Sequence, residues 1–389
     1  MRKKIVPAYI ATVLAIILLF AAMSSIEPLI ESNAYIPGFV DILLKAAEGS
    51  FLHRIFWFFG DMTEAYFFKS IFAAAGLIIF AVIADSLERK GRPFMGVPAL
   101  GGSGMFWPVI ATAVIGLIIT NIVYFEAGAW TPTFAPFVST APTLVLLFGR
   151  SPKKIVTSGV LAGFLTYPVS NWLFMNVANP LGIPGFCGVA LGMGIVTIIC
   201  IELCRIIPWM NEKDPVKETK EPNKEEAGPM EGSKLFYTRM LADPGEPVFW
   251  GSPLATVGLY SGAIIGWLLN PNSINYASDR FPVFLFGTLL TAATALFVWY
   301  PKYLKSGFAF TFICAVTTGS VLNTYSIPMV TLILTVIVSA AVMPALVHFL
   351  LEKIKITQRW HPCPIALICL GLVSGVWSMI IMHVPFLMG

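Results

Sequence analysis

The sequence predicts an all-α polytopic membrane protein with about eleven transmembrane helices and a cytoplasmic N-terminus. Three observations lead to this fold class: the composition, the length of the apolar stretches and the placement of the basic residues. The 389 residues are 57% hydrophobic and 12% charged, whereas soluble domains carry about 25% charged residues. A membrane β-barrel would instead show short segments of alternating polarity.

Eleven apolar stretches reach the roughly 20 residues that a helix needs to cross the hydrocarbon core. In chain order they cover 5–23, 65–85, 106–125, 132–149, 155–176, 184–207, 249–269, 281–300, 307–325, 327–351 and 363–387. The first stretch resembles a signal peptide, because it follows Arg2, Lys3 and Lys4. Its apolar run is longer than the roughly 7 to 15 residues usual there, so we expect an uncleaved helix.

The basic residues support this number of spans. With the N-terminus inside, 21 of the 25 Lys and Arg residues fall on the cytoplasmic side, as the positive-inside rule requires. The other four are Lys45, Arg54, Lys69 and Arg280. The net charge of +4 therefore reflects orientation, and we expect no nucleic-acid partner. The predicted location is a bacterial-type cytoplasmic membrane.

The chain divides at its one long polar stretch, Asn211 to Lys234, which has the composition of a disordered linker. Phe-Trp pairs at 106 and 249 and Pro-Lys pairs at 152 and 301 suggest a repeated four-helix unit whose two copies run in parallel. The predicted regions are 1–105 (two spans and an outer loop), 106–208 (first repeat unit), 209–248 (cytoplasmic linker), 249–351 (second repeat unit) and 352–389 (last span). A rival division pairs spans two to six with spans seven to eleven and gives an inverted repeat.

The first outer loop, from Tyr35 to Phe68, is long and mixes apolar with charged residues at helical spacing. Such a pattern is typical of amphipathic helices that lie at the membrane interface. We expect a passive interfacial collar in preference to a lid over an external entrance.

Two spans carry polar clusters where hydrocarbon is the expected neighbour. Proline removes a backbone donor inside the bilayer, so Pro168 predicts a kink or break in span five, and Gly319 loosens span nine. Packing between helices explains any single hydroxyl, but proline, glycine and carboxamide together favour a hydrated cavity at broken helices. The predicted solute-binding residues are Thr166, Tyr167, Ser170 and Asn171 in span five, and Thr317, Ser320 and Asn323 in span nine.

These clusters predict a transporter or permease for a small neutral, zwitterionic or anionic solute, with membrane lipid as the other partner. Acidic residues are lacking at the middle of the predicted spans, so no ion-coupling path is evident. The alternative is an integral membrane enzyme or assembly subunit that acts on a lipid, with Arg150, Lys153, Lys154, Lys302 and Lys305 holding a phosphate. Positive-inside orientation explains those residues better.

We predict no catalytic residues, no cofactor and no metal. Cys200 with Cys204, and His361 with Cys363, each offer two ligands, whereas structural zinc sites generally use four. The sequence leaves open the identity of the solute, the coupling ion, the direction of transport and whether the chain forms a homo-oligomer.

Overall fold

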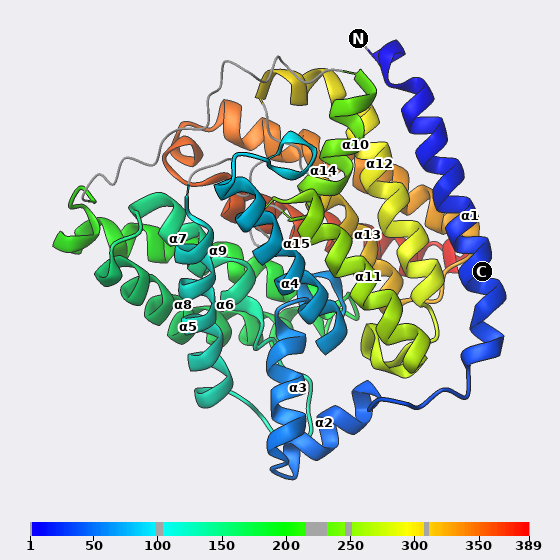
Figure 1. Ribbon diagram of the computed structural model, residues 1–389, viewed down its shortest axis with the longest axis horizontal. Helices are drawn as coiled ribbons and strands as arrows, with labels where there is room; N and C mark the ends of the chain where they lie inside the picture. Colours follow the sequence, from blue (N-terminus) through cyan, green and yellow to red (C-terminus); the bar gives the residue numbers. More distant parts are fainter. Residues whose placement is uncertain (1, 98–103, 215–231, 246–250, 307–310, 389) are drawn as a thin grey trace.

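The computed structural model describes residues 2–97, 104–214, 232–245, 251–306 and 311–388, and every regular element in these ranges is helical. Figure 1 shows their arrangement. The α-helices are α1 (Val6–Ile30), α2 (Phe39–Ala47), α3 (Phe51–Asp61), α4 (Ile71–Arg89), α5 (Phe106–Val123), α6 (Ala135–Val138), α7 (Thr140–Phe148), α8 (Pro152–Leu173), α9 (Gly185–Ile206), α10 (Gly232–Ala242), α11 (Pro253–Leu269), α12 (Phe281–Ser306), α13 (Thr311–Thr324), α14 (Met329–Lys353), α15 (Pro362–His383) and α16 (Pro385–Met388).

Seven helices in the described residues are long and apolar enough to cross a bilayer: α1, α4, α5, α9, α12, α14 and α15. The prediction of an all-α, multi-pass membrane protein is therefore confirmed at this level. The other four predicted spans correspond to α6 with α7, to α8, to α11 and to α13. At about 1.5 Å per residue, the 14 residues of α13 span about 21 Å, less than the hydrocarbon core. The number of eleven transmembrane spans stays a prediction.

Helix α1 lies at the edge of the bundle and contacts α12 and α10 (Figure 1). Most of its apolar side chains face away from the protein; Leu18 and Leu29 are 70% and 78% exposed. A helix with this much exposed apolar surface needs hydrocarbon around it, because in water the same surface would be strongly unfavourable.

The most extensive helix pair is α4 with α11. Glycines remove the side chains between the two backbones: a Cβ atom on Gly76 would lie 2.1 Å from the carbonyl oxygen of Gly258. Gly262 lies against Phe72, and Gly258 against Phe80. Because the numbering rises along α4 as it falls along α11, the two helices run antiparallel.

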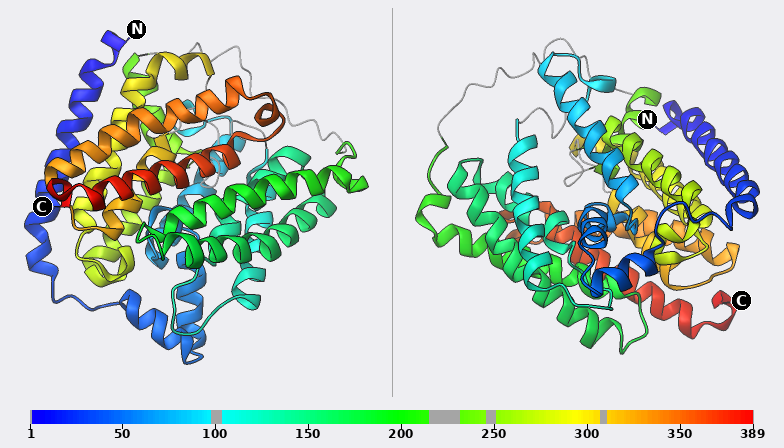
Figure 2. Two further views of the ribbon diagram at one scale, coloured as in Figure 1. Left: turned by 180° about the vertical axis from the view of Figure 1, so that it is seen from behind. Right: turned by 60° about the horizontal axis from the view of Figure 1, so that its bottom comes forward.

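A second pair, α9 with α15, crosses the bundle between α8 on one side and α13 and α14 on the other (Figure 2). Near one end of this pair, Glu202 of α9 accepts hydrogen bonds from Trp360 (2.7 Å) and Arg359 (3.1 Å), which precede α15. The carboxylate thus joins α9 to the segment that leads into α15.

The predicted interfacial loop forms the two short helices α2 and α3. Each has a buried apolar face, with Phe39 and Ile42 on α2 and Trp57 on α3. The end of α3 and the residues that follow are buried inside the bundle: Asp61, Glu64 and Phe68 have no exposed surface. This part of the loop is therefore not a surface collar.

The predicted linker, residues 209–248, is only partly within the described residues. Its described part includes α10 and the 3-10 turn η7 (Asp243–Gly245), and it buries Phe236, Met240 and Asp243. Residues 215–231 and 246–248 lie outside the description. The apolar spacing in α10 explains why this part of the linker packs against α11 and α12.

The glycine contact between α4 and α11 generates a stability prediction. Gly258→Val should lower the free energy of unfolding by at least about 2 kcal/mol, because a branched side chain cannot enter this gap without separating the backbones. The matched control is Ala75→Val, on an exposed face of α4. Thermal unfolding in detergent measures both; equal melting temperatures for the two variants would contradict the backbone contact.

Candidate functional site

A buried ionic cluster joins the end of α3 to the start of α4. Asp61 is the last residue of α3, Glu64 begins the 3-10 turn η2 (Glu64–Tyr66), and Lys69 precedes α4. The Lys69 ammonium forms ion pairs with Asp61 Oδ1 and Glu64 Oε2, and all three side chains are fully buried. Two carboxylates therefore share one cation away from water.

Neutral donors from distant parts of the chain complete the cluster. Asn121 of α5 donates its Nδ2–H to Asp61 Oδ2 at 2.7 Å. The indole of Trp130 and the hydroxyl of Tyr276 both donate to Glu64 Oε1, at 2.6 and 3.0 Å. Because buried carboxylates need several such donors, the cluster fixes the relative positions of these three segments.

Trp57 supports the cluster from α3. The Lys69 ammonium lies 3.7 Å from the centre of a Trp57 ring, a favourable cation–π distance. The indole N–H of Trp57 donates to Thr133 Oγ1 at 2.9 Å. The side chain of Trp57 thus links the cluster to the segment just before α6.

The backbone around the cluster is strained. Phe67 has a φ of 61°, and Asn275, Tyr276 and Ala277 have φ values of 46°, 57° and 64°. A non-glycine residue in this left-handed region costs on the order of 1–3 kcal/mol and tends to occur at functional sites. Here the conformation of η9 (Asn275–Ala277) carries Tyr276, whose hydroxyl reaches Glu64.

A cavity of about 250 Å³ lies next to the cluster. Trp130 and Tyr276 line it with their rings while their polar groups bond Glu64. The lining consists of six aromatic residues, one glycine and three neutral polar residues: Phe39, Phe67, Trp130, Phe174, Phe186, Tyr276, Gly185, Ser320, Asn323 and Thr324. Among the described residues that line it, none carries a charge.

Two helix ends meet at this cavity. Gly185 and Phe186 begin α9, and Asn323 and Thr324 end α13. A helix N-terminus presents unpaired N–H groups and partial positive charge, and a C-terminus presents carbonyls and partial negative charge. The Asn323 Oδ1 atom is buried without a hydrogen-bond partner in the part of the chain that the structure describes. The cavity therefore offers complementary sites to a dipolar molecule.

Of the three predicted residues on α13, Ser320 and Asn323 line the cavity. Thr317 donates to the Ile313 carbonyl of its own helix at 2.9 Å. Helix α13 continues through Gly319, where a Cβ atom would lie about 3 Å from the rings of Phe284 and Phe67. The glycine therefore makes room for these two rings, of which Phe67 lines the cavity and, with Phe186, forms its aromatic floor.

The predicted residues on α8 lie elsewhere. Thr166 donates to Thr140 Oγ1 at 2.9 Å, and Thr140 is 2.9 Å from Thr197 Oγ1, so the three hydroxyls link α8, α7 and α9. Tyr167 stacks on Tyr124 with 4.7 Å between ring centres. Both contacts are packing between helices.

Ser170 packs tightly against α9, since a Cβ atom on Gly192 would lie 2.5 Å from its Cα. Asn171 is half-buried. Neither residue is among those that line the cavity, so the structure does not bring the two predicted clusters into one pocket. Helix α8 continues through Pro168 to Leu173, and the irregularity follows it in the π-helical turn Phe174–Ala178.

Sequence reasoning missed the ionic cluster and the two aromatic donors. Asp61, Glu64 and Lys69 fall in or beside the stretch assigned to an interfacial loop, so the search for charge at the middle of spans passed over them. A usable signal was present: these three charges occur within nine residues and are surrounded by Trp and Phe. Trp130 and Tyr276 have no comparable pattern, since only tertiary contacts bring them to Glu64.

This arrangement can hold charge and a small solute side by side. In the described residues there is no group of three or more His, Cys, Asp or Glu side chains placed to hold a metal. No protein-family model, curated protein or solved structure matches the chain. The functional argument therefore rests on the geometry of this site.

The shared ammonium generates the second prediction. Lys69→Met should destabilise the protein by about 3–5 kcal/mol, because it leaves two buried carboxylates without a cation. Adding Glu64→Gln should recover part of the loss by removing one of the charges. Lys45→Met, on the exposed side of α2, is the control. Thermal unfolding of all three variants is the measurement, and wild-type stability of Lys69→Met would rule out the ion pairs.

Proposed function

We propose that the chain is a transporter for a small neutral or zwitterionic solute, which binds in the cavity between α9 and α13. The observation that supports this most is the lining itself: aromatic rings, neutral polar groups and two opposed helix ends, with the buried ionic cluster directly behind. An anion fits less well, because the lining has no cation and two carboxylates lie nearby. The cavity of about 250 Å³ is slightly smaller than typical ligand pockets of roughly 300–1,000 Å³, so it suits a small molecule.

We infer further that the bundle consists of two inverted units of five main helices, α4 to α9 (with α6 and α7 as one broken helix) and α11 to α15. Helices α4 and α11 would be equivalent, and so would α9 and α15, and each of these pairs is in contact. Neighbours match as well: α5 packs on α7 and α8 as α12 packs on α13 and α14. These contacts favour the inverted division over two parallel four-helix units.

The sequence around α4 and α11, the first helix of each unit, supports the same division. Residues 61–83 and 243–265 share nine identities at a constant separation of 182. The pairs are Asp61/Asp243, Glu64/Glu246, Phe67/Phe249, Ser70/Ser252, Ala73/Ala255, Gly76/Gly258, Leu77/Leu259, Ala81/Ala263 and Ile83/Ile265. Apolar composition alone does not place acidic and hydroxyl residues in register. Glu246 and Phe249 lie outside the described residues.

Matched residues also make matched contacts. Ser70 Oγ accepts from the N–H of Ala73 at 3.4 Å, and Ser252 Oγ accepts from that of Ala255 at 3.4 Å. Gly76 lies against Gly258 and each would clash with the other's carbonyl oxygen. Such reciprocity is expected where two equivalent surfaces meet about a two-fold axis.

Later helices continue the correspondence with slightly different separations. Thr133 and Phe134 match Thr311 and Phe312 at 178 residues, just before or at the start of the short helices α6 and α13. Pro168 inside α8 matches Pro344 inside α14 at 176 residues. Inverted repeats are common in secondary transporters, where one unit rocks against the other around a solute site at their interface.

The alternative, an enzyme or assembly subunit that acts on a lipid, has less support. Its candidate phosphate ligands include Lys154, which is buried and pairs with Asp214 at 3.0 Å, and Lys302, which pairs with Glu352. Ammonium groups held in this way are poor sites for a phosphate. We therefore keep transport as the proposal.

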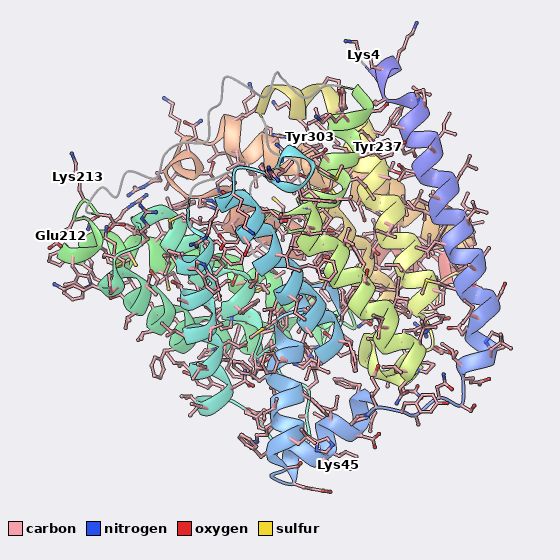
Figure 3. All side chains as sticks on the ribbon, viewed as in Figure 1. Lys4, Lys45, Glu212, Lys213, Tyr237 and Tyr303 are labelled. Carbon is pink, nitrogen blue, oxygen red and sulfur yellow. The ribbon has the colours of Figure 1, made fainter. Side chains whose placement is uncertain are left out.

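The proposed orientation puts the N-terminus on the cytoplasmic side of a bacterial-type cytoplasmic membrane. In Figure 3 the labelled Lys4 lies at the top of the molecule, Lys213 and Glu212 lie at its left edge well above Lys45, and Lys45 lies at the bottom. The cavity includes Phe39 of α2, at the lower end in Figure 1, so it would face outward.

A labelling experiment tests the orientation. In a cysteine-free background, Asp279→Cys should react with an impermeant thiol reagent applied to intact cells, and Glu212→Cys should react only after the membrane is opened. Both native side chains are at exposed positions, so access within the protein does not limit either reaction. The reverse pattern would place the N-terminus outside.

A second experiment tests the cavity. Purified protein screened against a metabolite library should gain about 2.7 kcal/mol of stability at a solute concentration of a hundred times the dissociation constant. Asn323→Leu should lose this gain while keeping the unliganded melting temperature, because the Asn323 amide oxygen has no partner to lose. Asn171→Leu is the matched control and should keep the gain in stability that the solute produces. If only Asn171→Leu loses the response, the solute site lies on α8 and the cavity is not the site.

A further inference from the structure

The ionic cluster carries an unbalanced charge whenever both of its carboxyl groups are ionised. Asp61 and Glu64 supply two negative charges when ionised and Lys69 supplies one positive charge, and all three side chains are fully buried. A net charge in such a place is strongly unfavourable unless it is compensated. One additional proton would make the cluster neutral.

The same cluster is connected mechanically to the cavity. Trp130 and Tyr276 form part of the cavity wall, and both donate to a single oxygen of Glu64. An ionised carboxylate holds two such donors more strongly than a neutral carboxyl group does. The charge on Glu64 therefore governs how firmly two aromatic walls of the cavity are held.

We propose that Glu64 is the proton-binding group of this protein, and that solute binding in the adjacent cavity is coupled to one proton there. This proposal rests on the transporter function proposed above. In the binding step a proton from water forms an O–H bond with the Glu64 carboxylate. Lys69 then remains paired with Asp61, and the cluster changes from one net negative charge to zero.

The surroundings favour a proton over a metal cation. In the described residues, the groups that hydrogen-bond the two carboxylates are N–H and O–H donors from Asn121, Trp130, Tyr276 and Lys69, and each presents a hydrogen atom to the carboxylate. Hard cations such as Na⁺ or Ca²⁺ need several oxygen ligands. The ammonium of Lys69 also occupies the position between the carboxylates that such an ion would take.

Other ionisable groups near Glu64 are few in the described residues. Asp61 approaches from α3, Lys69 from the start of α4 and Tyr276 from η9. The hydroxyl of Tyr66 donates to the Pro244 carbonyl. Beyond it, Asp243 of η7 pairs with Arg239 of α10, with 3.3 Å between Asp243 Oδ1 and Arg239 Nη1. Tyr260 of α11 packs on Tyr66. Among the groups that the structure describes, Asp61 is the other carboxyl group that shares Lys69.

An infrared pH titration tests the proton site without any solute. Protein in lipid nanodiscs is titrated between about pH 5 and pH 9 while the carbonyl stretch of protonated carboxyl groups is followed. We expect one titrating band in the wild type that is absent from Glu64→Gln. The matched control is Glu352→Gln, at the exposed end of α14, which should keep the band. A band that titrates equally in Glu64→Gln would overturn the proposal.

Tyr276→Phe provides a second variant if Glu64→Gln does not fold. It removes one hydrogen bond to the ionised carboxylate and leaves the ring in the cavity wall. The infrared titration should then move to higher pH by about one unit, because the charged form loses a donor. An unmoved titration in a folded Tyr276→Phe protein would exclude Glu64 as the titrating group.

The coupling is tested with the compound that stabilises the protein most in the library screen. Because one proton is taken up with the compound, its affinity should fall by up to tenfold per pH unit as the pH rises above the midpoint of the Glu64 titration in the wild type, and should be independent of pH in Glu64→Gln. The same pH dependence in both proteins would refute the coupling and leave the transporter function intact. A titrating Glu64 band in a protein that responds to no compound would instead count against the transporter function alone.

Discussion

The burial of Lys69 between Asp61 and Glu64 sets the position of much of the half of the bundle that contains α2 and α3. An ammonium removed from water needs anionic partners, and the carboxylates that satisfy it need donors of their own. Those donors come from α5, from the segment before α6 and from η9, which are far apart in the sequence. The cavity follows from this requirement, because two of the donors present their rings to it.

The aromatic floor of the cavity depends on the same segment. Phe67, in a left-handed conformation two residues before Lys69, packs on Phe186 of α9 and Phe284 of α12 with ring centres 4.9 and 5.7 Å apart. Any movement of the segment between Glu64 and Lys69 would alter both the charge cluster and this floor, so the two cannot change independently.

The sequence predicted the membrane class because each helix that crosses the bilayer must itself be long and apolar. This requirement is visible in the sequence of every such helix taken separately. It predicted Ser320 and Asn323 as cavity residues because carboxamide and hydroxyl groups beside a glycine are uncommon in hydrocarbon. The same reasoning did not separate Thr166, whose hydroxyl joins three helices, since a bond between helices and a cavity wall use the same residue types. Asp61 and Glu64 were missed because short helices and a turn carry them into the bundle, and a search along long helices does not reach them.

The contact between Gly76 and Gly258 has a consequence for how this protein can change over evolutionary time. Each residue is the other's nearest neighbour across the α4–α11 crossing, and the space for a methyl group is missing on both sides. A substitution at one position is therefore resisted by the backbone at the other, and a second substitution cannot compensate by making room. Lipid-facing residues of the same helices can be substituted one at a time during evolution. The two glycines, in contrast, are constrained together and are expected to be retained as a pair.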